Sequence, residues 1–368
     1  MSIALFISSL SAGGAERVMV FLANNLARLG HRVVLVTFAG DGSSFYRVDP
    51  RVERVHLDVR RPSKGKGTYQ LRQLRSLRFL LRALRPDVAV SFIVKANILV
   101  LLSAWGSGTP VVISDRLDPR AHPLDAARRV LRRLLYPRAT TLVVQTDSAL
   151  SFYPKSVRRR ATVVPNPVPR PPKATIADRG GGAPRAPLMV AMGRLHEQKG
   201  FDLLLRAFSS IRARHPTWRL EIWGEGKERG RLERLVVELG MQGEVKLPGL
   251  TNEPQKVLFG TELFVMSSRR EGFPNALCEA MACGCAVISF DCPSGPADII
   301  RPGIDGLLVP PRDVSSLAVA MDRLMADHAE RRRLGSNALS VVERFSSSRV
   351  MAQWTELLSR AAAESHRA

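Results

Sequence analysis

The stretch that decides the fold is IALFISSLSAGGAERVMVFLANNLARLGHRVVLVTF, residues 3–38. It opens with an apolar run of strand length, which leads into a loop rich in serine and glycine. Apolar residues then recur at helical spacing over 17–30 until Gly30 ends the helix, and 31–38 is a second apolar strand. Strand, glycine loop, helix and strand in this order predict the right-handed parallel unit of a doubly wound α/β domain.

The same alternation runs through the rest of the 368 residues, a length that suggests two domains. The stretch between the two halves contains seven prolines and a glycine triplet, a composition that cannot pack as a core. We therefore predict a first Rossmann-like domain over 1–168, a linker over 169–187 and a second such domain over 188–346. A final helix, 347–368, is expected to cross back to the first domain. Because ligands of such sheets bind beyond the carboxyl ends of the strands, the two domains are expected to face a central cleft.

The chain is strongly basic, with 55 Lys and Arg against 33 Asp and Glu and a net charge of +22. Most of the excess lies in two windows of the first half, 51–90 and 120–170, which carry +8 and +9. Such a surface favours phosphate-bearing partners: nucleic acid, anionic lipid or phosphorylated small molecules.

The four cysteines fall between 278 and 292 without zinc-finger spacing and without a nearby histidine. They are expected to be buried, reduced thiols, and no metal is expected. The apolar run 88–105 is interrupted by Lys95 and Asn97, so it is not expected to cross a membrane.

Two loops carry residues suited to phosphate. Gly13 and Gly14 precede a predicted helix, where backbone N–H groups can approach an anion, although a plain strand–helix turn explains them equally well. In MGRLHEQKGF, 192–201, Arg194 and Lys199 lie between a strand and a helix. Two cations beside a helix N-terminus suit a diphosphate, and the alternative is a pair of solvated loop residues.

Two glutamates flank a Gly-Phe-Pro turn in RREGFPNALCEAMACG, 269–284. Pro274 suits the first turn of a helix, so Glu271 lies ahead of the helix and Glu279 on its side. A carboxylate close to buried surface is costly unless it is paired or bound to a ligand. The alternative is an acidic residue at the positive end of a helix together with a solvated glutamate.

These motifs, in this order, resemble a known family. The segments 192–208, 222–235, 271–289 and 294–313 look like the second domain of the retaining glycosyltransferases of family 4, the group 1 transferases with the GT-B fold. SAGGAERV in the first half and Asn-Pro-Val at 166–168 fit as well, so the resemblance covers nearly the whole chain. The similarity is greatest to members that build polyprenyl-diphosphate-linked saccharides.

The resemblance implies a donor site for a UDP-sugar, with no cofactor and no metal required. Glu271 would act at the reacting sugar and Glu279 would accept hydrogen bonds from the ribose. The remaining implied roles are diphosphate binding by Arg194, Lys199, Gly13 and Gly14, donor-sugar contacts by Gly272, Phe273, Pro274 and Asn275, backbone contacts to the α-phosphate by Ala276 and Leu277, and base contacts by Pro248 and Leu250.

The first-domain catalytic loop departs from many relatives, in which a histidine follows the strand that is TPVVIS here. This chain continues with Asp115-Arg116-Leu117-Asp118-Pro119. Asp118 is the catalytic candidate for contacting the sugar or activating the acceptor, and Arg116 for contacting a phosphate or the acceptor. His122 is expected to be solvated.

A basic stripe is predicted on a first-domain helix. Leu71, Leu74, Leu77, Leu81 and Leu84 form an apolar stripe, and an arginine follows each of them at Arg72, Arg75, Arg78, Arg82 and Arg85. Arg128, Arg129, Arg132 and Arg133 add a second patch. This basic face suits an anionic membrane and a lipid-linked acceptor, and the alternative is an ordinary Arg-rich surface.

The sequence therefore predicts a retaining transferase that moves a hexose or N-acetylhexosamine from a UDP-sugar to a lipid-linked acceptor in glycan assembly. It is expected to be cytoplasmic and peripheral on the inner face of the plasma membrane. One alternative keeps the fold with a soluble acceptor. A nucleic-acid-binding protein is less favoured, because aromatic residues are few, 6%, and are not expected to interleave with the basic patches, which occupy helical faces of an α/β domain.

Overall fold

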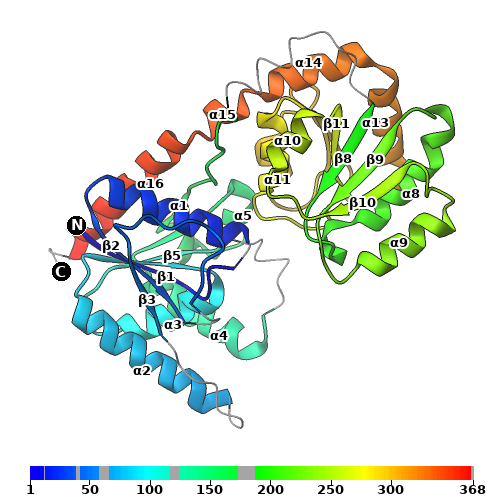
Figure 1. The fold of residues 1–368 in the computed structure, drawn as a ribbon. Coiled ribbons are helices and arrows are strands. Elements are labelled where there is room, and N and C mark those ends of the chain that lie inside the picture. The colour runs from blue at the N-terminus through cyan, green and yellow to red at the C-terminus, as the bar shows by residue number, and fades with distance from the viewer. Residues whose placement is uncertain (12, 39–41, 58–65, 117–123, 173–186, 366–368) are drawn as a thin grey trace. The chain divides into compact units, whose positions relative to one another are not determined.

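The computed structural model describes residues 1–11, 13–38, 42–57, 66–116, 124–172 and 187–365. Two compact units make up the chain (Figure 1). The first unit contains Met1–Asn166 together with Ser348–Ala368, and the second contains Pro167–Ser347.

The first unit is built on a parallel sheet in the order β3-β2-β1-β4-β5-β6-β7. Its strands pair in parallel throughout, for example Leu5 with Leu35 and with Val90. The strands are β1 (Ser2–Ile7), β2 (Arg32–Thr37), β3 (Glu53–His56), β4 (Val88–Phe92), β5 (Val111–Ser114), β6 (Thr141–Val144) and β7 (Ala161–Val163).

Helices cover both faces of this sheet, because alternate strand residues point to opposite sides. α1 and α16 pack on the face that carries Ile3 and Leu5, whereas α2 and α3 pack on the face of Ala4 and Phe6 (Figure 1). The helical segments are α1 (Gly14–Arg28), α2 (Lys66–Leu84), α3 (Val94–Ala104), α4 (Ala126–Leu135), η1 (Tyr136–Arg138), α5 (Asp147–Leu150), α6 (Lys155–Arg158) and α16 (Ser347–Ser365).

The second unit repeats the plan with the order β10-β9-β8-β11-β12-β13. Its strands are β8 (Leu188–Met192), β9 (Arg219–Trp223), β10 (Val245–Gly249), β11 (Leu263–Met266), β12 (Ala286–Phe290) and β13 (Leu307–Val309). Its helical segments are η2 (Glu197–Lys199), α8 (Phe201–Ile211), η3 (Arg212–Arg214), α9 (Arg229–Glu238), α10 (Pro254–Phe259), α11 (Asn275–Ala282), α12 (Pro296–Ile299), α13 (Val314–Ala326), α14 (His328–Ala338) and α15 (Val341–Arg344).

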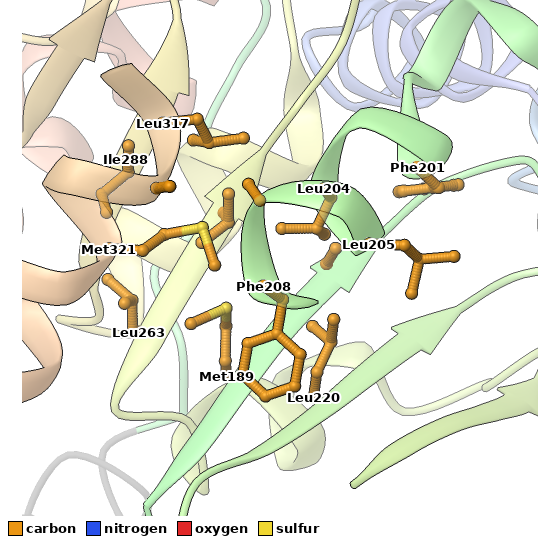
Figure 2. Packing of buried hydrophobic residues seen from close by; sticks show 14 of the residues in the cluster. Met189, Phe201, Leu204, Leu205, Phe208, Leu220, Leu263, Ile288, Leu317 and Met321 are labelled. Carbon is orange, nitrogen blue, oxygen red and sulfur yellow. The ribbon is translucent and has the colours of Figure 1, made fainter. Parts of the chain in front are cut away.

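The core of the second unit fixes α8 on its sheet. Leu204 and Phe208 of this helix meet Met189 and Leu220 from the strands, and Met321 of α13 approaches from the neighbouring helix (Figure 2). Arg194 and Lys199 lie in the segment between β8 and α8. Because the core fixes α8, this segment is held beyond the carboxyl end of β8.

α8 begins differently from the sequence-based expectation. Since aspartate favours the N-cap position, the sequence predicts Asp202 as the cap. Gly200 is the cap instead, in the left-handed region at φ 63°, and Asp202 lies in the first turn. The prediction fails because the Asp202 carboxylate is held by Arg269 instead of by the helix backbone.

The apolar run near β4 divides into a strand and helix α3, and among the described residues no helix has the length and hydropathy of a membrane span.

Candidate functional site

The candidate site lies where the strand order of the second sheet reverses. β8 and β11 are neighbours there, although strands β9 and β10 come between them in the chain and lie on the other side of β8. The loop after β8 carries Arg194 and Lys199, and the loop after β11 carries Glu271. In parallel α/β sheets this reversal point opens the crevice in which ligands bind.

Lys199 and Glu271 are brought into direct contact. Lys199 Nζ lies 2.6 Å from Glu271 Oε1, and Ser268 Oγ donates to the same oxygen, also at 2.6 Å. The Glu271 side chain is 7% exposed and that of Lys199 is 25% exposed. A carboxylate buried to this degree requires such partners. The structure thus brings together Lys199 and Glu271, both named from the sequence, and adds Ser268, which the sequence analysis missed.

A second ion pair braces the two loops. Arg269 donates to both carboxylate oxygens of Asp202, at 2.8 and 2.7 Å, and to the carbonyl of Glu197 at 2.8 Å. Ser267 Oγ donates to the carbonyl of Lys199 at 3.0 Å. The loop that holds Lys199 is thus tied to the loop that holds Glu271 through side-chain and backbone contacts that the sequence did not reveal.

Electrostatics of the brace favour its charged form. Burial raises the pKa of Asp202, but the hydrogen bonds and charge of Arg269 outweigh burial and hold that pKa below its usual value. The same hydrogen bonds raise the pKa of Arg269. Both groups therefore remain ionised at neutral pH, and the brace is a bidentate charge-assisted contact.

Gly200 is required at the centre of this brace. Its φ of 63° suits glycine, and a Cβ there would collide with the carbonyl oxygen of Ser267. The close approach of the two loops therefore depends on the absence of a side chain at this position.

Helix α11 starts where the sequence predicted. Pro274 is its N-cap and Asn275 its first residue, so Glu271 precedes the helix and Glu279 lies at its fifth position, half-buried. The first N–H groups of a helix have no partner within the helix, so those of Ala276 and Leu277 are suited to bind an anion.

The turn before α11 packs against Phe345 and against the loop that follows β12. Phe273 contacts Phe345 edge-to-face with ring centroids 5.4 Å apart. Gly272 contacts the next loop, where Ser294 Oγ donates to its carbonyl at 3.3 Å and a Cβ on Gly295 would lie 2.7 Å from the same oxygen. The turn is therefore fixed by the loop after β12.

The other predicted donor residues are at the surface of the second unit. Arg194 is exposed, and Pro248 and Leu250 are exposed at the end of the edge strand β10, with Leu250 at 76%. These side chains are available to a ligand, and the structure does not itself bring the last two into the Lys199–Glu271 cluster by any hydrogen bond or ion pair among the described residues.

In the first unit, Gly13 and Gly14 lie at the carboxyl end of β1, where Gly13 is the N-cap of α1. Tyr46 donates its hydroxyl to the Gly13 carbonyl at 3.1 Å. Beside them in the sheet, β4 is followed directly by Ile93, a β-branched residue with φ 77° that is the N-cap of α3. Such a conformation is strained and often marks a functional edge.

Asp115 and Arg116, after β5, are both buried. Asp115 accepts hydrogen bonds from Tyr136, Tyr153 and Asn97, yet burial still raises its pKa. Burial likewise lowers the pKa of Arg116 to about 9. Arg116, expected to meet a phosphate or the acceptor, donates instead to Ser114 and Asn166 and is 6% exposed.

The catalytic candidate Asp118 and its neighbour His122 lie outside the described residues.

The basic stripe of α2 is only partly as predicted. Leu74, Leu77, Leu81 and Leu84 are buried or half-buried. Leu71 is 48% exposed, and the fully buried side chain near it is instead Gln73, which donates to the carbonyl of Phe38. The arginines one position later, Arg72, Arg75, Arg78, Arg82 and Arg85, are all exposed. On α4, Arg129 and Arg133 are exposed, and Arg128 and Arg132 are half-buried.

The expectation that aromatic side chains do not interleave with the basic patches is wrong. Phe79 is 76% exposed among the arginines of α2, and Trp105 is 54% exposed with Arg138 stacked 4.7 Å above its ring. Trp105 lies far from α2 in the sequence, so only folding brings it there.

The four cysteines, at 278, 283, 285 and 292, are buried free thiols, as predicted. Burial, together with the charge of Glu271, raises the pKa of Cys292 to about 12. Among the described residues no group of three or more His, Cys, Asp and Glu is arranged to hold a metal ion.

Two family models match the chain. Residues 13–169 match the glycosyl transferase 4-like domain, and residues 174–341 match the glycosyl transferases group 1. Together they span both units and include the Lys199–Glu271 cluster.

Several similar proteins have names that refer to the assembly of saccharides. An exopolysaccharide phosphotransferase of Streptomyces coelicolor is 30% identical over 94% of this chain, which spans only 39% of that protein's length. A Campylobacter jejuni α-1,4-N-acetylgalactosaminyltransferase, named for a diphospho-undecaprenol-linked saccharide, is 28% identical and covers 97% of this chain and 98% of its own. The solved structure of Anabaena HepE with UDP superposes with a TM-score of 0.79 at 18% identity, covering 98% and 100% of the two chains.

Proposed function

Because this chain belongs to the group 1 glycosyltransferases with the GT-B fold, we propose that it transfers a hexose or N-acetylhexosamine from a UDP-sugar to a lipid-linked saccharide with retention. The observation that carries this proposal is the Lys199–Glu271 pair beside the start of α11. It joins a cation and a carboxylate beside the first backbone N–H groups of a helix, beyond the carboxyl ends of neighbouring strands.

In the proposed reaction, the bond between the anomeric carbon and the UDP oxygen breaks, and an acceptor hydroxyl bonds to that carbon on the same face. The hydroxyl proton passes to the departing phosphate. Lys199, Arg194 and the N-terminus of α11 stabilise the charge that develops on the diphosphate, so the proposal needs no metal ion. Glu271 contacts the sugar, and Lys199 exchanges part of its contact with Glu271 for the diphosphate.

Glu279 accepts hydrogen bonds from the ribose in this proposal, and Asp118 assists at the acceptor. Gly272 to Asn275 contact the sugar, and Pro248 and Leu250 contact the base. Gly13 and Gly14, at the N-terminus of α1, bind the diphosphate through backbone N–H groups in this proposal.

We assign a polyprenyl-diphosphate-linked saccharide as acceptor and the inner face of the plasma membrane as the working location. Support comes from the exposed arginines of α2 and α4 and from the named acceptor of the Campylobacter relative. A diphosphate on a lipid and an anionic leaflet would both attract this face.

The first test is equilibrium binding of a panel of sugar nucleotides to the full chain and to Glu279→Ala. One UDP-sugar should bind saturably, and the variant should bind it about 10- to 150-fold more weakly, as expected for the loss of a hydrogen bond to a charged group, about 1.5–3 kcal/mol. Glu238→Ala, which removes an exposed carboxylate from α9, is the matched control and should bind as the wild type does.

Equal binding by both glutamate variants would remove Glu279 from the donor site. Absence of binding for every UDP-sugar, with binding of another nucleotide sugar, would overturn the uridine assignment and keep the transferase.

A further inference from the structure

The basic face of the first unit contains large apolar side chains that the core does not use. Phe79 of α2 is 76% exposed, Trp105 at the end of α3 is 54% exposed, and Val130 and Leu134 of α4 are 57% and 55% exposed. We call these four residues the apolar band. Exposed apolar residues gathered in one place, unlike scattered ones, indicate an interaction surface.

Two hydrogen bonds and a cation–π contact connect Trp105 to α2 and to the end of α4. Arg78, next to Phe79, donates to the carbonyl of Trp105 at 3.3 Å. Arg138 stacks over the ring of Trp105 and donates to the carbonyl of Leu134. α3 packs between α2 and α4, so the surfaces of the three helices are continuous.

Arginines of α2 and α4 flank the band. Phe79 has Arg75 and Arg82 one helical turn before and after it, and Arg133 adjoins Leu134, all with exposed side chains. Neither 66–85 nor 126–138 contains an aspartate or glutamate. The surface is thus apolar at its centre and cationic around it.

We propose that the apolar band inserts into the interfacial layer of an anionic lipid bilayer while the arginines around it bind lipid phosphates. This inference rests on the proposed lipid-linked acceptor and adds the side chains that enter the membrane. Aromatic side chains and guanidinium groups are the combination that membrane interfaces favour. A second copy of this chain does not fit, because two such faces would repel each other.

Insertion differs measurably from attraction by charge alone. Attraction between surface charges is screened by salt, whereas apolar insertion is not. The band therefore gives the protein a salt-resistant component of membrane binding that the arginines cannot supply.

The experiment measures binding of the full chain to vesicles of phosphatidylglycerol with phosphatidylcholine. Phe79→Ser should weaken binding by about tenfold, the effect of exposing roughly one aromatic side chain, at low and at high salt alike. Arg75→Gln with Arg82→Gln should also weaken binding, but should reduce its salt dependence. Val319→Ser removes an equally exposed apolar residue (69%) from α13 of the second unit and should have no effect.

Trp105 reports its own position. Of the four tryptophans it is the exposed one, since Trp218 and Trp354 are buried and Trp223 is half-buried. Lipids brominated on the acyl chains should quench its fluorescence on binding, and Trp105→Phe should remove the quenching without removing the binding. Bound protein whose Trp105 is not quenched would overturn the insertion.

Binding of Phe79→Ser to the vesicles with wild-type affinity would also overturn the proposed insertion of the apolar band. Loss of oligonucleotide retention in that variant, with unchanged vesicle binding, would assign the band to nucleic acid. Conversion of a dimer to a monomer by Phe79→Ser would assign it to a second copy. UDP-sugar binding, measured on the same samples, should stay unchanged. A negative result for membrane insertion therefore leaves the proposed donor site valid, and a negative result for UDP-sugar binding leaves the proposed insertion valid.

Discussion

At the scale of single residues, the candidate site is organised by one buried carboxylate. Glu271 has almost no contact with solvent and shares one oxygen between Lys199 and Ser268. A buried ion pair adds little to the free energy of unfolding when both partners are present. The loss of one partner lowers that free energy strongly, because the remaining charge stays desolvated. The pair therefore couples stability to the presence of a cation at position 199.

Replacing Lys199 with methionine should lower the free energy of unfolding of the second unit by about 1–3 kcal/mol. The double variant Lys199→Met with Glu271→Gln should lose less than the sum of the two single changes, because the buried charge is gone. Urea denaturation of the four proteins measures this coupling.

Lys256→Met is the control, since Lys256 pairs with Glu253 on the surface, where both side chains are more than half exposed. It should change stability by less than about 0.5 kcal/mol. If Lys199→Met and Lys256→Met lower the free energy of unfolding equally, the buried Lys199–Glu271 pair stabilises the protein no more than a surface ion pair does.

At the scale of elements, two loops act as one because of the brace between Asp202 and Arg269. The first turn of α8 and the loop after β11 come from strands that are neighbours in the sheet, and the bidentate pair joins them beyond the strand ends. Gly200 allows the approach and the Ser267 hydroxyl completes it. Positioning of Lys199 against Glu271 is thus a property of the loop pair and not of either loop alone.

Asp202→Asn should destabilise the protein at neutral pH by about 1.5–3 kcal/mol, because a charge-assisted contact becomes a weaker one. The folded-state pKa of Asp202 is lowered, so its stabilising effect is complete above the pKa in the unfolded chain and is lost as pH falls through the folded pKa. The difference between variant and wild type should therefore stay constant down to about pH 4 and shrink below it.

Unfolding experiments across this pH range, with Glu253→Gln as the control for an exposed carboxylate, test the assignment. A difference that already disappears near neutral pH would point to another titrating group.

At the scale of the whole molecule, each unit has cores of its own, and the end of the chain belongs to the first. α16 contributes Val350, Trp354 and Leu358 to the core that contains Ile3 and Leu5. Trp354 is fully buried against Phe92, with ring centroids 5.9 Å apart, and its indole N–H has no hydrogen-bond partner in the part of the chain that the structure describes.

Trp354→Ala should destabilise the first unit by about 3–5 kcal/mol, whereas Trp354→Phe should cost clearly less, because the N–H makes no bond that phenylalanine would lose. Hydrogen exchange of β1 and β4, compared with β8 and β11, measures each unit separately. The change should be confined to β1 and β4. Equal protection in wild type and Trp354→Ala would mean that α16 adds no stability to the first unit.

The sequence alone determined the α/β class, the start of α11, the contrast between Glu271 ahead of that helix and Glu279 on it, and the outward arginines of α2. These features follow from local periodicity and from residues that start or end helices, and they act over a few positions of the chain. The same rules placed Leu71 in the core wrongly, because the buried residue in this part of α2 is the polar Gln73, whose hydrogen bond to the Phe38 carbonyl no hydrophobic pattern reveals.

Only the tertiary structure decided which residues hold the site together. Arg269 binds Asp202, 67 positions away in the chain, and Lys199 binds Glu271, 72 positions away. Arg78, the neighbour of Phe79, donates a hydrogen bond to the carbonyl of Trp105. Such contacts depend on the strand order of a sheet, which no local pattern encodes. The residue types with their periodicity thus specify the elements, whereas the partners of buried charges and the composition of a surface depend on which elements become neighbours.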